Sequence, residues 1–147
     1  MSYLKEQIIQ HVKDNDFGMQ IYFSVEEEPL GTGGAIKRAF NLCKNKNVFV
    51  VNGDTFFDVD LTSMMNFALT HNVDITVATK KMINFERYGT LKIENDFVIE
   101  MNEKMPCDVG YINGGIYCLR RDFLIGIPQE KFSFEKDILD RVGKVEK

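Results

Sequence analysis

The fold of this chain is decided by the string Glu28-Pro29-Leu30-Gly31-Thr32-Gly33-Gly34-Ala35-Ile36, which is followed by Val48-Phe49-Val50-Val51-Asn52-Gly53-Asp54. The first string is a glycine-rich turn that leads into a helical pattern. The second is a continuous apolar run, typical of a strand buried on both faces, and it ends on a single carboxylate. Open α/β sheets bind ligands at the carboxyl ends of their strands, so the two strings predict a site at that edge of a sheet.

The glycine turn and the strand-end aspartate point to a nucleotide and a divalent cation. The three glycines let a planar base or a sugar approach the backbone, and the next helix, capped by Thr32, directs free N–H groups to the same space. Asp54 occupies a position typical of a Mg²⁺ ligand, because Mg²⁺ prefers one or two carboxylates together with phosphate oxygens. A tight turn and a turn carboxylate are the structural alternatives. The nucleotide-binding candidates are Gly31, Thr32, Gly33, Gly34, Asn52 and Gly53, and the candidate for metal binding and catalysis is Asp54.

Composition places the chain among ordinary globular domains, and we interpret residues 1–147 as one domain. The hydrophobic fraction is 44%, and the net charge of −4 favours neither nucleic acid nor an acidic membrane surface as a partner. No apolar run is long enough for a transmembrane helix, and Met1–Glu6 lacks the layout of a signal peptide. The three cysteines have no CxxC spacing, which predicts reduced thiols in a cytoplasmic protein.

Periodic apolar patterns predict alternating helices and strands in the first half, which indicates a parallel sheet flanked by helices. The helices are expected at 4–12, 32–43 and 61–69, and the strands at 21–25, 48–51 and 74–78. The second half adds a hairpin around Glu94-Asn95-Asp96, a strand at 111–119 interrupted by Gly114-Gly115, and a last helix at 134–142. The predicted fold class is therefore α/β, with a mixed sheet flanked by helices.

Three later strings offer groups that suit a phosphorylated sugar. Glu103-Lys104 follows a strand and supplies a lysine for a phosphate. Asn113, next to Gly114-Gly115, combines an amide with exposed backbone, which suits hydroxyls that need both donors and acceptors. Ser133 begins a helix in which Glu135 can face a sugar hydroxyl. A solvated ion pair, a β-bulge and ordinary helix capping are the respective structural alternatives.

In their order along the chain, these strings resemble the sugar-1-phosphate nucleotidyltransferases, most closely the group that transfers guanylyl to heptose 1-phosphate or mannose 1-phosphate. Phe56-Phe57-Asp58 and Phe132–Glu135 look most like the heptose 1-phosphate branch. The resemblance implies a three-layer, Rossmann-like fold of the GT-A type. The matching strings are Glu28–Ile36, Val50–Asp58, Arg87–Thr90, Glu103-Lys104, Ile112–Tyr117 and Phe132–Asp137.

The resemblance also implies roles for individual residues. Gly33 and Gly34 would lie against the base and the ribose, and Asp54 would be one of two Mg²⁺ ligands. Asp54 and Lys104 would be the catalytic residues. The sugar and its phosphate would meet Gly89, Glu103, Lys104, Asn113, Gly115 and Glu135.

The implied activity is transfer of a nucleotidyl group, here guanylyl, from GTP to a sugar 1-phosphate with release of pyrophosphate. The sugar would be of the heptose or mannose type, the cofactor Mg²⁺, and the product a nucleotide sugar for cell-surface polysaccharides such as lipopolysaccharide or capsule. Because the attacking phosphate is already an anion, in-line positioning and charge neutralisation suffice without a protein base.

Two signatures of the family have no counterpart in this sequence. They are a G-G-x-G-T-R-L loop, which supplies cationic grip on the triphosphate, and a D-I-G-T-P string, which holds the second metal aspartate. On the resemblance, the fold is expected to be incomplete at both ends and the chain nearly inactive alone. Without the family's first strand, Val48–Val51 keeps an open edge, which predicts a homo-oligomer.

Two other interpretations stay open. A glycosyltransferase would show D-x-D at its metal, and Asp58-Val59-Asp60 has these letters, although it lies beyond the strand end. These carboxylates are otherwise expected in the turn and the cap before the helix at Leu61. A catalytically dead relative that binds a nucleotide sugar, or serves as a partner subunit, would keep the base and sugar contacts without the phosphate loop.

Overall fold

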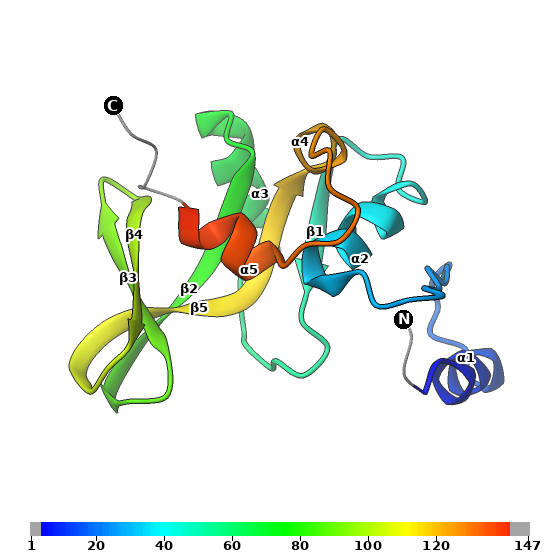
Figure 1. Ribbon diagram of the computed structural model, residues 1–147, viewed down its shortest axis with the longest axis horizontal. Helices are drawn as coiled ribbons and strands as arrows, with labels where there is room; N and C mark the ends of the chain where they lie inside the picture. Colours follow the sequence, from blue (N-terminus) through cyan, green and yellow to red (C-terminus); the bar gives the residue numbers. More distant parts are fainter. Residues whose placement is uncertain (1–3, 142–147) are drawn as a thin grey trace.

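The structure, a computed structural model, describes residues 4–141 and contains within them one five-stranded sheet (Figure 1). Its spine is the long strand β5 (Cys107–Arg120). Leu119 of β5 pairs with Val48 of β1 (Asn47–Val51) and also with Ile75 of β2 (Ile75–Phe85), so β5 lies between these two strands. The remaining strands, β3 (Gly89–Glu94) and β4 (Phe97–Lys104), join the sheet through β3 and β5.

The sheet differs from the predicted parallel arrangement. β1 and β2 point in the same direction, as the alternation of helices and strands predicts, but β5 separates them and is antiparallel to both. Every strand pairing within residues 4–141 is antiparallel. The alternating pattern constrains the direction of consecutive strands, whereas it carries no information on a later strand that inserts between them.

The predicted hairpin is confirmed. Asn95 and Asp96 connect β3 to β4, and both have positive φ angles, of 48° and 66°. Two consecutive residues with positive φ form the type I′ turn that matches the natural twist of paired strands.

Helices cover both faces of the sheet, which confirms the predicted layers. On one face, α2 (Gly31–Phe40), α4 (Arg121–Ile125) and α5 (Phe134–Asp137) pack around Tyr117 and Leu119 of β5. On the other face, α3 (Leu61–His71) packs on Ile116 and Cys118. Alternate residues of β5 thus serve two cores, as the two-residue period of a strand requires.

Residues 4–22 contribute little to this body, since nearly all of them are exposed. Helix α1 (Lys5–Asp14) is confirmed as a helix, but it lies apart from the sheet and contains no buried residue (Figure 1). The strand predicted at 21–25 is wrong, because the structure has an irregular segment there. A strand forms only where its backbone finds a partner, and no strand within residues 4–141 runs beside this segment. β1 likewise pairs with β5 alone among the described strands, as the predicted open edge requires.

Helix ends show which capping predictions hold. Asp60 caps α3 by accepting from the Thr62 and Ser63 amides, as predicted. Thr32 is not a cap, since α2 begins at Gly31 after Leu30 and has no side-chain cap. The helix predicted at 134–142 is shorter: α5 ends at Asp137, a 3₁₀ turn η1 (Leu139–Arg141) follows, and Val142 lies outside the described residues.

The predictions about the cysteines and about membrane-spanning helices concern the chain as a whole. All three cysteines are free, in agreement with the predicted thiols. Within residues 4–141, no helix has the length and apolar character needed to cross a membrane.

Phe134→Ala should destabilise the fold by about 3–5 kcal/mol, because the Phe134 side chain is completely buried and packs edge-on against Tyr117 at a ring separation of 5.0 Å. Urea unfolding followed by circular dichroism measures the change. Phe56→Ala is the matched control, since Phe56 is fully exposed, and it should change stability by less than about 0.5 kcal/mol. Equal effects of the two substitutions would contradict the core assignment.

Asp60→Ala should lower stability at pH 7 and make little difference in acid. The Ser63 hydroxyl and amide hold the pKa of Asp60 below its ordinary value of 3.8, so the stabilisation is complete above that value and disappears as pH falls through the lower folded pKa. Urea midpoints of both proteins at pH 7 and at acid pH measure this. A difference that persists unchanged at the acid end would contradict the capping role.

Candidate functional site

The glycine turn is packed against a segment from the other end of the described chain. The Gly33 and Gly34 amides donate to the Phe132 carbonyl at 3.0 and 3.4 Å, and the Phe132 amide donates to the Leu30 carbonyl at 3.0 Å. A Cβ on Gly33 would collide with the Phe132 ring, and Gly31 has a φ of +74°. The chain itself therefore requires glycines here. The predicted free N–H groups at the start of this helix therefore do not include those of Gly33 and Gly34, which are bonded within the chain.

Thr32 connects this turn to Glu135. Its Oγ1 donates to Glu135 Oε2 at 2.6 Å and accepts from the Phe134 amide at 2.9 Å. Ser133 Oγ, which also caps α5 as predicted, donates to the same carboxylate oxygen at 3.1 Å. The structure thus brings together one residue predicted to bind the nucleotide and one predicted to bind the sugar.

The second part of the site is a bulge in β5 at Gly114-Gly115. The pairing of β2 with β5 shifts register between Val77 and Thr79, which confirms the bulge. Asn113 is held at both ends of its amide: Nδ2 donates to the Tyr117 hydroxyl at 2.8 Å, and Oδ1 accepts from the Gly115 amide at 2.9 Å. The bulge and the asparagine are therefore one fixed unit.

The end of β1 lies against this bulge. The Asn52 amide donates to the Gly115 carbonyl at 3.0 Å. A Cβ on Gly115 would come within 2.9 Å of Asn52 Nδ2 and 3.0 Å of Thr55 Oγ1. Asn52, Asn113 and Gly115 thus meet at the carboxyl end of β1. Sequence reasoning missed Thr55, whose only signal is its position directly after Asp54.

Asp54 is exposed beside these residues, and no hydrogen bond or ion pair within residues 4–141 engages its carboxylate. That part of the chain contains no group of three acidic, histidine or cysteine side chains that could hold a metal by themselves. A single free carboxylate fits the coordination preference of Mg²⁺, which binds one or two carboxylates and completes its shell with oxygens of phosphates and water. The residues present therefore suit Mg²⁺ bound together with a phosphorylated ligand.

Tyr117 was predicted only as part of a strand, yet its hydroxyl holds the Asn113 side chain by a hydrogen bond. Burial raises the pKa of its phenol, the Asn113 hydrogen bond opposes this, and the Glu135 charge raises it further. The phenol therefore stays neutral at physiological pH, and its oxygen accepts the hydrogen bond from Asn113 Nδ2.

The other candidates lie at the base of the hairpin. Gly89 pairs with Lys104, and a Cβ on Gly89 would press on the Asn102 carbonyl. Glu103 and Lys104 are exposed. Because β3 is antiparallel to β5 with Leu91 opposite Tyr111, the start of β3 points toward the Asn113 end of β5. The hairpin thus directs these residues toward the same region, although no hydrogen bond or ion pair within residues 4–141 joins Glu103 or Lys104 to the bulge.

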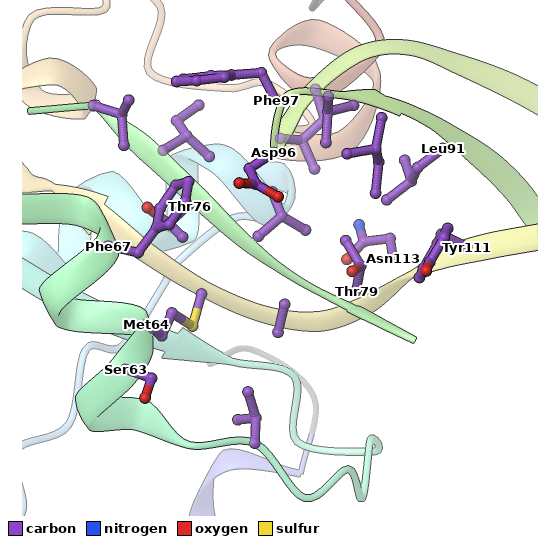
Figure 2. Close-up of a pocket in the computed structure, with 18 of the residues that line it drawn as sticks. Ser63, Met64, Phe67, Thr76, Thr79, Leu91, Asp96, Phe97, Tyr111 and Asn113 are labelled. Carbon is purple, nitrogen blue, oxygen red and sulfur yellow. The ribbon is translucent and has the colours of Figure 1, made fainter. Parts of the chain in front are cut away.

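A cavity of about 810 Å³ opens between α3, β2 and the hairpin (Figure 2). Asn113 is the one predicted site residue that lines it, beside Tyr111 and Thr79, while Phe67 of α3 and Phe97 of β4 line the far end. The cavity results from the position of the hairpin relative to α3 and β2, which no local pattern in the sequence indicates.

The chain matches a family model for nucleotidyl transferases over residues 1–144. It belongs to this family. The mixed α/β architecture agrees with the family match, and the predicted recognition and fold class are confirmed.

Individual proteins of known sequence or structure resemble the chain more specifically than the family model does. The chain is 44% identical over 147 residues to the D-glycero-alpha-D-manno-heptose 1-phosphate guanylyltransferase of Campylobacter jejuni, and 43% identical over 140 residues to that of Aneurinibacillus thermoaerophilus. The crystal structure of HddC from Yersinia pseudotuberculosis complexed with GMP-PN superposes over 95% of the chain with a TM-score of 0.86 and 38% identity. The chain spans 64%, 61% and 62% of these three proteins.

Gly115→Ala should destabilise the fold by about 1–2 kcal/mol, because Gly115 has a φ of +72°, which strains any residue with a Cβ, and the methyl group would also press on the side chains of Asn52 and Thr55. Thermal unfolding measures the loss. Gly53→Ala, in the adjoining loop, is the control: nothing lies within 4 Å of its added Cβ, and stability should stay within about 0.5 kcal/mol. A neutral Gly115→Ala would contradict the tight junction of bulge and loop.

Proposed function

We propose that this chain contributes the base and sugar sides of a nucleotidyltransferase site that uses GTP and a heptose- or mannose-type sugar 1-phosphate. The observation that carries the proposal is the junction of the Asn52–Thr55 loop with the Asn113–Gly115 bulge at the carboxyl end of β1. Ligands of open α/β sheets bind at such an edge. The guanylyltransferase relatives, at 44% and 43% identity, support the choice of base and sugar.

In the proposed reaction, an oxygen of the sugar 1-phosphate attacks the α-phosphorus of GTP. A new phosphorus–oxygen bond forms as the bond to pyrophosphate breaks, and the product is a GDP-sugar. The attacking group is an anion, so the protein's task is to align the two phosphates and to offset their charge. Lys104, exposed at the end of β4, is proposed to offset charge on the sugar phosphate.

The same proposal assigns the other residues. The glycine turn, Asn52 and Gly53 would meet the nucleotide, and Gly89, Glu103, Asn113, Gly115 and Glu135 would meet the sugar. Mg²⁺, when bound, would offset charge on the phosphates. Asp54 is the residue proposed to hold it, because its exposed carboxylate is free of other described partners.

A binding module that holds a nucleotide sugar without turnover is the second candidate. One observation favours it: two amides of the glycine turn are already bonded to the Phe132 carbonyl. Such a module would bind the kind of nucleotide sugar that the enzyme produces, and a cytoplasmic location is proposed for both. Calorimetric binding of GDP-sugars without release of pyrophosphate supports the module, whereas pyrophosphate release from GTP and mannose 1-phosphate or heptose 1-phosphate supports the enzyme.

Asp54→Asn should weaken Mg²⁺-dependent GTP binding by at least about tenfold, because the neutral amide loses the charge that attracts the metal. Isothermal titration with GTP, with Mg²⁺ and then with EDTA, measures the effect. Asp58→Asn is the control, since Asp58 is an exposed carboxylate four residues further along the same loop. If Asp54→Asn binds GTP with wild-type affinity and the same Mg²⁺ dependence, the metal assignment is wrong.

The chain should form a homo-oligomer, because an unpaired strand edge accepts a strand from another copy. β1 has β5 as its sole described neighbour, and Val51 at its end is 55% exposed. Light scattering at micromolar concentration measures the mass. A monomer across that range would contradict this proposal.

A further inference from the structure

Thr32 is the residue of the glycine turn whose side chain reaches the predicted sugar side. Thr32 is exposed in the first turn of α2, and Glu135 lies on α5, which packs beside α2 (Figure 1). The two residues are 103 positions apart in sequence, so their hydrogen bond is a tertiary contact and no product of local geometry.

The Thr32 hydroxyl is used in both directions. As a donor it binds Glu135 Oε2 at 2.6 Å, and as an acceptor it takes the Phe134 amide at 2.9 Å. A hydroxyl has one proton and two lone pairs, so this arrangement fixes its rotation. The backbone bond at Phe134 and the carboxylate bond at Glu135 therefore support each other.

Two hydroxyl donors converge on one carboxylate oxygen of Glu135. Thr32 and Ser133 bind Oε2, at 2.6 and 3.1 Å, and no donor within residues 4–141 binds Oε1. The carboxylate is held through Oε2, while Oε1 is available to accept a hydrogen bond from a ligand. This is the arrangement expected of a group that is oriented by the protein in order to accept from a ligand.

We propose that Thr32 is a positioning residue that orients Glu135 for the sugar and thereby couples the nucleotide turn to the sugar subsite. This inference rests on the proposed function, because the contact of Glu135 with the sugar belongs to it. The backbone bonds to Phe132 join the glycine turn to the segment before α5, and the Thr32 hydroxyl is the group of the turn that contacts the Glu135 carboxylate. The coupling makes Thr32 a determinant of sugar affinity although it lies on the nucleotide side.

The test compares a ligand that fills both subsites with one that fills the nucleotide subsite alone. Affinities for GDP-mannose and GDP are measured by isothermal titration, in the presence of Mg²⁺, for wild type, Thr32→Val and Thr32→Ser. Valine keeps the shape without the hydroxyl, and serine keeps the hydroxyl. Thr62→Val is the control, because Thr62 is the second residue of α3 as Thr32 is of α2, and its side chain is exposed.

Thr32→Val should weaken binding of GDP-mannose about tenfold more than binding of GDP, as expected for a lost hydrogen bond to a charged group on the sugar side. Thr32→Ser and Thr62→Val should match wild type. Adding Thr32→Val to Glu135→Ala should cause no further loss, because the hydroxyl acts through the carboxylate. Equal losses for both ligands, or no loss for either, would overturn the inference.

A second measurement needs no ligand and separates this inference from the proposed function. If wild type binds neither ligand, the proposed function fails, and hydrogen exchange of the Phe134 amide then decides the positioning role. Thr32→Val should speed that exchange by about tenfold, because the amide loses its acceptor, while Thr32→Ser and Thr62→Val leave it unchanged. Unchanged exchange in Thr32→Val would overturn the inference.

Discussion

The backbone bonds between the glycine turn and Phe132 are the constraint on which the site depends. Three amide–carbonyl bonds tie Leu30, Gly33 and Gly34 to this one residue, and the absence of side chains at the glycines makes the approach possible. Lys37 of α2 extends the attachment, since its Nζ binds the Ile127 and Gln129 carbonyls and the Glu130 carboxylate at 2.8, 3.3 and 2.7 Å. Helix α5 has four residues and would not be stable alone, so these bonds are what place Glu135.

The strand β5 gives this attachment a rigid base. Tyr117 and Leu119 face the core under α2, α4 and α5, while Ile116 and Cys118 face α3, and all four are at most 5% exposed. Protein interiors are close-packed and transmit displacement, so the two faces of β5 cannot shift independently. The bulge at Gly115 interrupts this strand beside the end of β1, where the site residues meet. The site is thus built where a stiff element has one irregular point.

Much of this could be predicted from sequence because the decisive signals are local. The hairpin turn, the Asp60 cap, the bulge at Gly114-Gly115 and the recognisable order of the motifs all follow from short strings. Three features could not be predicted from the sequence. The strand order depends on a long-range insertion, the predicted strand at 21–25 lacks a partner, and Thr32 prefers a tertiary contact with Glu135 to capping its own helix. In each case, a contact between distant segments overrides a sound local preference.

The site prediction shows the same division. Asn52, Asn113 and Gly115 lie together, and Thr32 contacts Glu135, so the fold brings these candidates together, while their roles in ligand binding stay a prediction. The glycine turn, by contrast, was predicted to contact a ligand, whereas in the structure it packs against Phe132 of the same chain. Tyr117 and Thr55 were missed because a buried tyrosine and a lone threonine carry no pattern that distinguishes them from ordinary core and loop residues.

The bulge in β5 also determines which insertions this fold can tolerate. Between Val77 and Thr79 the strand β2 advances by two residues, while β5 advances by four, from Asn113 to Tyr117. Both steps are even, so side-chain alternation survives the irregularity, and Asn113 stays on the face of Tyr117, where the two side chains bond. One residue more or fewer would turn everything on one side of the bulge to the opposite face of the sheet. Insertions or deletions at the bulge must therefore contain an even number of residues, and this restriction holds whatever ligand the chain binds.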